Sequence, residues 1–280
     1  MSLTTKSGKL VPTLFYGTAW KKAATISLVA LALRSGFRAV DTACQRTQYR
    51  EDLVGEGIAQ ASIPREDLFI QTKFALPSDQ DPNFIPYDVN APLEDQVRQS
   101  FAQSLQNLRT DYLDSVLLRS PARTVEETVT IINVLNEFKK KAQVRHLGIS
   151  NIYSLSLVQQ ICFQLPPSTI QIIQNRFYLE MGYDVRLRKY CKDNGIMYQA
   201  FGTVVGNQNV LRSKTVKRVG ERIRASEVVV FYRFCIQEGI TVLCSPDKEE
   251  HMKEDLLVAT EEQFALKHNE MIGIRTVLND

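Results

Sequence analysis

The sequence predicts an α/β protein, a closed (β/α)8 TIM barrel formed as a single domain over residues 1–280. Two observations support this prediction. Short apolar runs alternate with amphipathic helical segments along most of the chain, and eight runs can be counted, the number that closes a parallel barrel. The rival architecture is a doubly wound open sheet, which usually carries a GxGxxG turn after its first strand, and no such turn is present.

The eight predicted strands are short and rich in apolar residues. We place them at Leu14–Tyr16, Phe37–Val40, Leu68–Thr72, Leu113–Leu118, Val144–Ile149, Ile170–Gln174, Ile196–Phe201 and Ile240–Leu243. Apolar residues at helical spacing fill the intervals, and they predict helices at Thr25–Ser35, Arg50–Ala61, Leu93–Leu108, Val125–Lys140, Leu155–Gln164, Tyr183–Asn194, Lys214–Ile223 and Ser226–Gln237.

Three further segments complete the predicted fold. Residues 1–12 alternate weakly around Ser7-Gly8, which indicates a short N-terminal hairpin. The Pro-, Ser- and Asp-rich stretch Leu76–Pro92 is too short for a linker, so we expect a long loop over the barrel mouth that shapes a pocket or simply varies at the surface. Residues Glu261–Asp280 predict a helix followed by a tail that crosses the barrel.

Composition excludes several functional classes. The chain is 44% hydrophobic and 23% charged with a net charge of +3, and no basic stripe indicates nucleic acid. No apolar run approaches the ~20 residues that span a bilayer, and the N-terminus lacks the apolar core of a signal peptide. The five cysteines show no CxxC spacing and the three histidines form no HxxxH pair, so we expect a reducing compartment and no metal. These features predict a cytoplasmic monomer that acts on a small molecule and binds neither nucleic acid nor membrane.

Two polar residues that follow neighbouring predicted strands, together with a tyrosine before the intervening helix, suggest a proton-transfer site. The strand Phe37–Val40 is followed by Asp41, and Tyr49 lies just before the next helix. The strand Leu68–Thr72 is followed by Lys73. A tyrosine has an unperturbed pKa near ~10, and an adjacent lysine ammonium lowers that pKa while a carboxylate keeps the lysine charged and oriented. The alternative is an Asp–Lys ion pair that closes the barrel, with Tyr49 as helix packing.

Several motifs resemble those of the aldo-keto reductase superfamily. They are GTAW at 17–20, Asp-Thr-Ala at 41–43 with Tyr49 and VGEGI at 54–58, Gln-Thr-Lys at 71–73, DYLDSVLL at 111–118, VRHLGISN at 144–151, IIQNRFY at 172–178 and EEHMKEDL at 249–256. The resemblance covers nearly the whole chain, and the spacing from Asp41 to Tyr49 is most similar to that of the fungal branch. It implies a (β/α)8 barrel, a nicotinamide dinucleotide, usually NADP(H) with NAD(H) as the alternative, and reduction of a carbonyl.

The resemblance implies a catalytic tetrad of Asp, Tyr, Lys and His, of which Asp41, Tyr49 and Lys73 match. Arg119, in the run LLRSP, stands in place of the histidine. If Arg119 points into the site, its permanent charge favours tyrosinate and binds a developing negative charge, while its bulk occupies space where a ketone would lie. The alternative is that Arg119 turns aside to pair with a carboxylate, Asp41 included, and leaves a weakened reductase.

The resemblance also implies a set of cofactor-binding residues and one substrate-binding residue. Ser150, Asn151 and Gln174 would hold the nicotinamide carboxamide, and Phe201 would stack on the ring. The other positions implied for the cofactor are Gly17, Thr18, Ala19, Gly202, Thr203, Val204, Ser245, His251, Glu254 and Asp255, and Trp20 is a wall of the substrate pocket. At the adenosine end Ser245 and His251 replace the usual cations, and Asp247 would repel a 2′-phosphate. Gly202 replaces a bulkier residue of the fungal branch, which would widen the pocket beside Phe201.

Three hypotheses for function remain open from the sequence. The first is an NAD(P)H-dependent reductase acting on an aldehyde or ketone of a small organic substrate, secondary metabolites included, with Tyr49 as proton donor. The second is a non-redox enzyme on the same scaffold, an isomerase, dehydratase or cyclase, that uses Tyr49 as a base with Lys73 and Arg119. The third is a catalytically silent subunit that keeps the cofactor as a ligand.

Overall fold

The computed structural model describes residues 3–279, without the side chains of residues 258–260 and 279. Eight parallel strands form a closed barrel in the order β1 to β8, so the predicted fold class is confirmed. The strands are β1 Leu14–Gly17, β2 Ala39–Asp41, β3 Phe69–Phe74, β4 Leu113–Leu118, β5 Val144–Ser150, β6 Ile170–Arg176, β7 Met197–Phe201 and β8 Thr241–Cys244. Each lies within about two residues of its predicted position, the accuracy expected of strand boundaries.

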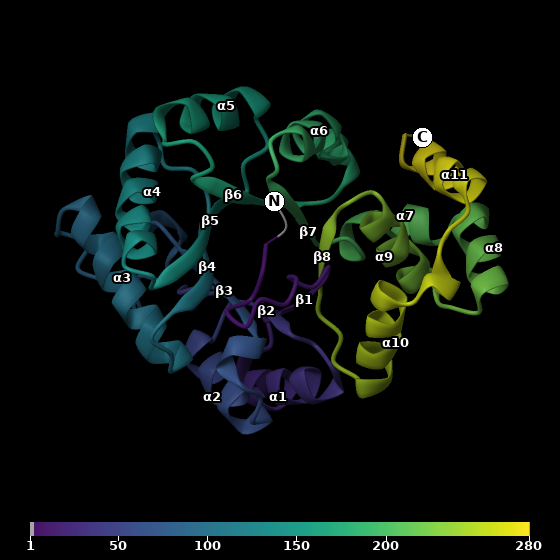
Figure 1. The fold of residues 1–280 in the computed structure, drawn as a ribbon, viewed down its shortest axis with the longest axis horizontal. Helices are drawn as coiled ribbons and strands as arrows, with labels where there is room; N and C mark the ends of the chain where they lie inside the picture. The colour runs from purple at the N-terminus through teal and green to yellow at the C-terminus, as the bar shows by residue number, and fades with distance from the viewer. Residues whose placement is uncertain (1–2, 280) are drawn as a thin grey trace.

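Helices surround the barrel in the alternation that the sequence predicts (Figure 1). They are α1 Thr25–Ser35, α2 Glu51–Ala61, α3 Leu93–Leu108, α4 Val125–Lys140, α5 Leu155–Gln164, α6 Val185–Asp193, α7 Gln208–Leu211, α8 Lys214–Ile223, α9 Glu227–Gln237, α10 Glu249–Thr260 and α11 His268–Asn279. Short 3₁₀ turns lie at Lys22–Ala24, Arg65–Asp67, Pro77–Asp79, Leu179–Asp184, Val205–Asn207 and Glu262–Phe264. Side-chain oxygens cap several helix starts; Thr124 Oγ1, for example, accepts a hydrogen bond from the backbone N–H of Glu127.

The barrel interior contains an apolar cluster and polar side chains. Phe15, Phe69, Leu117, Ile172 and Leu243 form a cluster with Leu3 and Val11 of the N-terminal segment. Successive residues of a strand point to opposite faces, so in β3 the side chains of Phe69, Gln71 and Lys73 all enter the barrel. In β3 the apolar Phe69 therefore lies toward the amino end and the polar Gln71 and Lys73 toward the carboxyl end, where Leu243 of the apolar cluster also lines a cavity.

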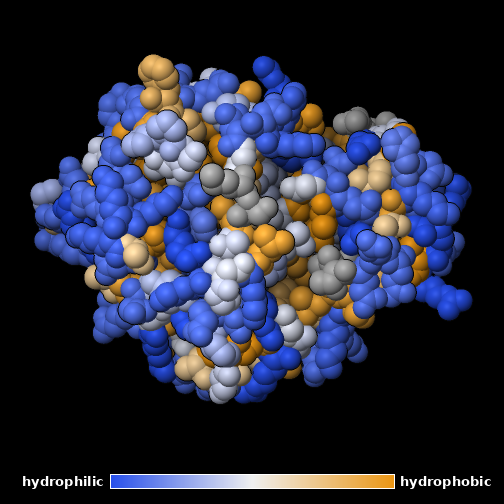
Figure 2. All heavy atoms as spheres, viewed as in Figure 1, coloured by the Kyte–Doolittle hydropathy of each residue, from blue (hydrophilic) through white to orange (hydrophobic). Residues whose placement is uncertain are grey.

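The N-terminal segment covers the amino end of the barrel. An isolated antiparallel bridge joins Thr4 to Leu10, as the predicted hairpin requires, and the segment passes over the middle of the ring of strands in Figure 1. On this face the outer helices present mainly hydrophilic atoms, and hydrophobic atoms show between the N-terminal segment and α10 (Figure 2). Since this end is closed, the open end is the one at which the strands finish.

The VGEGI motif brings three helices into close contact. A Cβ atom built on Gly55 would lie 2.1 Å from the carbonyl oxygen of Asn107 in α3, and one built on Gly57 would lie 2.7 Å from that of Ile26 in α1. Only glycine allows backbones to approach so closely. These glycines therefore fix the position of α2, which begins just after Tyr49.

The C-terminal segment differs from its prediction. Residues 261–267 contain a 3₁₀ turn and no α-helix, and the final helix α11 packs on the outside of the barrel beside α7 and α8. The prediction of a tail that crosses the barrel is therefore wrong for residues 261–279. The apolar side chains of α11, including Met271, Ile274 and Leu278, are buried against neighbouring helices, which holds this segment to the side. Within residues 3–279 no helix combines the length and apolar character that a bilayer span requires.

Candidate active site

A cavity of about 660 Å³ opens at the carboxyl ends of the strands. Its walls come from the carboxyl ends of the strands and from the loops that follow them, except the loop after β3, and this end of the barrel is the position of the active site in this fold class. All four members of the predicted tetrad, Asp41, Tyr49, Lys73 and Arg119, line this cavity.

Asp41 and Lys73 form a buried ion pair at the base of the cavity. The Lys73 Nζ donates to Asp41 Oδ1 at 2.7 Å, to Asp41 Oδ2 at 2.6 Å and to the carbonyl oxygen of Thr42 at 2.9 Å. Both residues are only 2% exposed. Asp41 ends β2, whereas Lys73 is one residue short of the end of β3 rather than just beyond it as predicted. The carboxylate therefore fixes the position of the ammonium group.

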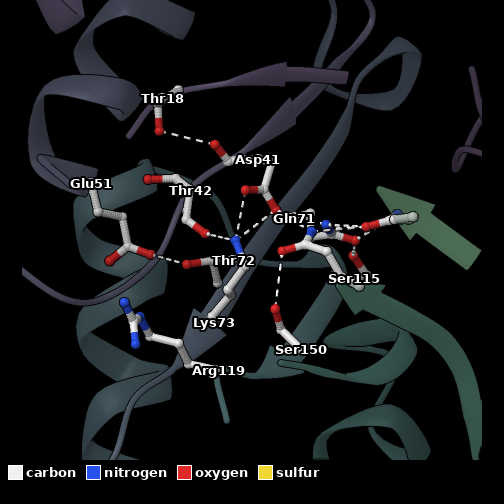
Figure 3. Close-up of polar contacts among 12 residues, drawn as sticks. Thr18, Asp41, Thr42, Glu51, Gln71, Thr72, Lys73, Ser115, Arg119 and Ser150 are labelled. Atoms are coloured by element: carbon white, nitrogen blue, oxygen red, sulfur yellow. Dashed lines mark hydrogen bonds and ion pairs between the residues drawn. The ribbon is translucent and has the colours of Figure 1, made fainter. Parts of the chain in front are cut away.

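Two glutamines donate hydrogen bonds to Asp41 and a third links them to each other; Figure 3 shows Gln71 beside Asp41. The Nε2 of Gln71 and that of Gln174 donate to Asp41 Oδ1 at 2.7 and 3.0 Å. Both amides also donate to the Oε1 of Gln199, at 2.8 and 2.9 Å, and Ser115 Oγ donates to Gln71 Oε1 at 2.7 Å. A buried carboxylate needs donors for its lone pairs, and this network supplies two of them and holds Asp41 in place.

Tyr49 stands beside the ammonium group. The Lys73 Nζ lies 5.3 Å from the centroid of the Tyr49 ring. Burial raises the pKa of Tyr49 above its usual value, whereas Lys73 and, more weakly, Arg119 lower it. The influence of Lys73 thus has the predicted direction, but desolvation outweighs it, so the expectation of a net lowered pKa is not met and Tyr49 stays protonated at neutral pH.

Arg119 lines the cavity but does not pair with Asp41. Its Nη1 lies 3.5 Å from Oδ2 of Asp79, in the loop after β3, and its side chain is 17% exposed. Figure 3 shows the guanidinium directed away from the Asp41–Lys73 pair. The structure combines parts of the two predicted orientations. The arginine turns toward a carboxylate, that of Asp79, yet it remains a wall of the cavity.

The residues expected around a nicotinamide begin beside Arg119, whose carbonyl oxygen accepts a hydrogen bond from Asn151 Nδ2 at 2.9 Å. Ser150, Asn151, Gln174 and Phe201 all line the cavity. The backbone of Asn151 has a positive φ of 54°, a left-handed conformation that asparagine adopts more readily than most residues. The NH2 group of Gln174 is already used by Asp41 and Gln199. The NH2 group of Asn151 donates to the carbonyl oxygen of Arg119 at 2.9 Å, and the Ser150 hydroxyl donates to Gln174 Oε1 at 3.3 Å. A carboxamide would therefore use the remaining lone pairs of Ser150 Oγ and Asn151 Oδ1.

A second cavity of about 440 Å³ adjoins the first. The two share walls at Gly202, Val205 and Ser245, and the residues expected along the rest of the dinucleotide, Thr203, Val204, His251, Glu254 and Asp255, line the second cavity. Gly17, Ala19, Trp20, Gly202 and Ser245 line the first. Two adjoining cavities lined by amide, hydroxyl and backbone groups suit a dinucleotide.

Two of the expected residues differ from their predicted roles. Thr18 is fully buried and lines neither cavity, because its hydroxyl donates to the carbonyl oxygen of Asp41 at 2.9 Å and holds the end of β2. Gly202 does not widen the pocket as proposed from its size. A Cβ atom at this position would lie 3.3 Å from Cγ of Arg176, so the arginine side chain occupies that space.

Acidic residues surround the part of the second cavity where the adenosine of a dinucleotide is expected. Lys21 pairs with Asp247 and donates to the carbonyl oxygen of Ser245 at 2.7 Å. Lys253 pairs with Glu249 at 2.7 Å, and Lys248 lies 3.7 Å from Glu250. Burial raises the pKa of Asp255 to about 7, with Cys244 lowering it and Glu254 raising it further. The cations near this end are therefore already matched by carboxylates.

Sequence reasoning missed several residues of the site. Gln71 and Gln199 support Asp41, and Arg176, Tyr153 and Tyr178 line the cavity. The two glutamines lie two residues before Lys73 and Phe201, so strand alternation could have placed them inside the barrel. The partnership of Arg119 with Asp79 had no such signal.

Comparisons with known proteins identify the family of this chain and its fold. The model of the Aldo/keto reductase family matches residues 13–272. The chain is 29% identical over 235 residues to the methylglyoxal reductase DkgB of Escherichia coli O157:H7, covering 82% of this chain and 80% of that protein. It is 25% identical over 260 residues to an uncharacterized oxidoreductase of Schizosaccharomyces pombe, covering 91% and 85%. An aldo-keto reductase from a Medee basin deep-sea metagenome library superimposes with a TM-score of 0.83 over 100% of this chain and 96% of that one, at 22% identity, and shows the shared fold.

Proposed function

Because this chain belongs to the aldo/keto reductase family, we propose that it is an NAD(P)H-dependent oxidoreductase that reduces the aldehyde or ketone of a small organic molecule. Reductases among its relatives support this assignment at the level of an oxidoreductase acting on a carbonyl. The observation that carries the proposal is the arrangement of Tyr49 beside a lysine that a buried carboxylate positions, on the wall of a cavity of about 660 Å³. Part of the proposal is that the protein works as a cytoplasmic monomer on small organic substrates, secondary metabolites included.

When bound, the dinucleotide supplies a hydride to the carbonyl carbon. The carbonyl oxygen receives its proton from Tyr49, so one carbonyl, one NAD(P)H and one proton give one alcohol and one NAD(P)⁺. Lys73 stabilises the tyrosinate that remains, because its ammonium is fixed close to the ring and cannot turn away while Asp41 holds it. Water then returns the proton to Tyr49.

Ser150 and Asn151 would orient the carboxamide, and Phe201 would present its ring face to the nicotinamide. The second cavity would accept the remainder of the dinucleotide along Gly202–Val204, and Ser245, His251, Glu254 and Asp255 would surround the adenosine. We include both NADP(H) and NAD(H) in the proposal, since the cations near Ser245 are matched by carboxylates that would oppose a 2′-phosphate.

The first experiment is a titration of the protein with NADPH and with NADH. Trp20, the one tryptophan of the sequence, lines the active-site cavity, so its fluorescence reports on binding there. Micromolar binding of either dinucleotide, together with oxidation of the bound cofactor by an aldehyde panel, is the expected result. Absence of binding at millimolar concentration would refute the redox assignment and favour proton chemistry by Tyr49 without a cofactor.

Tyr49→Phe tests the proton donor. The structure assigns no hydrogen bond to the phenol oxygen of Tyr49 within residues 3–279, so we expect unchanged stability and cofactor binding with at least a hundredfold loss of kcat. Tyr153→Phe is the matched control, because this second phenol lines the same cavity and contacts Asn151 Oδ1 at 3.4 Å. Equal losses in the two variants would show that Tyr49 has no special role.

A further inference from the structure

The Arg119 guanidinium faces the active-site cavity without a strong partner. Within the described part of the chain its side chain makes no hydrogen bond, and its closest carboxylate oxygen, Asp79 Oδ2, lies 3.5 Å from Nη1. That oxygen already accepts a hydrogen bond from Ser120 Oγ at 2.7 Å. The carboxylate of Asp79 is thus only a partial counter-ion for Arg119.

A guanidinium in this situation is suited to an anionic ligand. It carries five N–H donors in a planar fork that matches the two oxygens of a carboxylate. The Arg119 side chain is 17% exposed, so most of its water has been removed and its donors are costly to leave unmatched. A carboxylate entering the cavity would supply the acceptors that the protein does not.

A second guanidinium lines the same cavity. Arg176, the last residue of β6, lines the cavity and forms no ion pair in residues 3–279; its guanidinium carbon lies 4.8 Å from the centroid of the Tyr178 ring. Arg119 follows β4 and Arg176 ends β6, the two strands on either side of β5, so both arginines lie on the same part of the cavity wall. Tyr153 lies between the two arginines in the cavity wall. Its hydroxyl contacts Asn151 Oδ1 at 3.4 Å and accepts a hydrogen bond from the backbone N–H of Arg176 at 3.3 Å.

The charges that line the cavity therefore do not cancel. Asp41 and Lys73 neutralise each other through their direct contact. Arg119 and Arg176 remain, and Asp79 offsets the first of them only in part. A neutral carbonyl compound would make no use of this excess positive charge, whereas an anionic one would be attracted to it and oriented by it.

We propose that the substrate is a carbonyl compound that also carries a carboxylate, and that Arg119 binds this carboxylate while its carbonyl oxygen lies at Tyr49. Arg176 adds attraction at the mouth of the cavity. The proposal rests on the reductase function proposed above and names its substrate class. It also gives Arg119 a role in place of a histidine: the residue selects and orients the substrate.

The test compares acids with their uncharged esters. The probes are 2-, 3- and 4-formylbenzoate and the three matching methyl esters, with NADPH or NADH oxidation as the readout. We expect kcat/KM of at least one acid to exceed that of its ester at least tenfold in the wild-type protein. Arg119→Gln should abolish this ratio by lowering the value for the acid, while Arg123→Gln, at an exposed arginine outside the cavity, should leave it unchanged.

Asp79→Asn provides a second variant that does not depend on removing Arg119. The amide removes the competing negative charge and keeps an acceptor for Ser120, so we expect the ratio of acid to ester to rise severalfold. A wild-type protein that reduces the esters as well as or better than every acid would overturn the proposal. So would an unchanged ratio in Arg119→Gln.

Binding separates this proposal from the proposed function. Isophthalate, which carries two carboxylates and no carbonyl to reduce, should quench or shift Trp20 fluorescence in the wild-type protein and bind at least tenfold more weakly to Arg119→Gln. If no aldehyde is reduced but isophthalate binds in this way, the reductase function fails and the anion site stands. If neutral aldehydes are reduced and isophthalate does not bind, the reductase function stands and the anion site fails.

Discussion

The buried pair of Asp41 and Lys73 gives a quantitative prediction about stability. Lys73→Met removes three hydrogen bonds of 2.6 to 2.9 Å and leaves the Asp41 carboxylate with the donors of Gln71 and Gln174, both on Oδ1. Removing one member of a buried ion pair costs about 3–5 kcal/mol because the other charge stays buried. Since the two glutamines still stabilise the carboxylate, we expect the lower end of this range, about 3 kcal/mol.

Asp41→Asn leaves the ammonium of Lys73 with the Thr42 carbonyl and one amide oxygen, and we expect a similar cost of about 3 kcal/mol. The double variant buries no charge, so it should be destabilised by less than the sum, about 2 kcal/mol. Urea unfolding of the four proteins at pH 7.5 measures the free energies of unfolding and hence the coupling between the two residues. Single variants within about 1 kcal/mol of wild type, or a double variant at about 6 kcal/mol, would refute this reasoning.

Three further predictions concern other residues. Reduction requires protonated Tyr49, so the rate of reduction falls as pH rises through the pKa of Tyr49. Because Arg119 lowers this pKa, Arg119→Gln should move the alkaline fall of kcat to higher pH. A shift to lower pH would contradict the assignment. The pKa of Asp255 is about 7 in the folded protein and ~3.9 in the unfolded chain, so burial of Asp255 lowers the free energy of unfolding progressively as pH rises between these values. Asp255→Asn should therefore be more stable than wild type at pH 8, by ~4 kcal/mol at most, and equally stable near pH 4. Urea unfolding at the two pH values measures this difference. Gly55→Ala places a Cβ 2.1 Å from the Asn107 carbonyl oxygen and should lower the free energy of unfolding by about 3 kcal/mol, whereas an unchanged Tm would mean that α2 and α3 separate freely.

The alternation of strands and helices was the part of the fold that the sequence predicted best. Strand positions follow from the two-residue period of buried side chains, and helix positions from the 3.6-residue period, both of which are local properties. The strand that ends on Asp41 and the strand that contains Lys73 are neighbours in a parallel barrel, so their contact could be foreseen once the fold class was known. The C-terminal segment was predicted less well, because its apolar face fits a helix on the outer surface as well as a tail across the barrel.

The sequence by itself thus determined the barrel and the set of residues that could carry proton transfer, since both depend on periodicity and on which residues end a strand. Only the tertiary structure decided that Arg119 turns toward Asp79, that Gln71 and Gln199 support Asp41, and that the side chain of Arg176 occupies the space beside Gly202. The physical reason is that the direction of a long polar side chain depends on partners far away in the sequence, and many partners of similar chemistry are available until the chain is folded. For Arg119 the sequence left open Asp41 or a carboxylate elsewhere, and the loop that carries Asp79 supplied the partner.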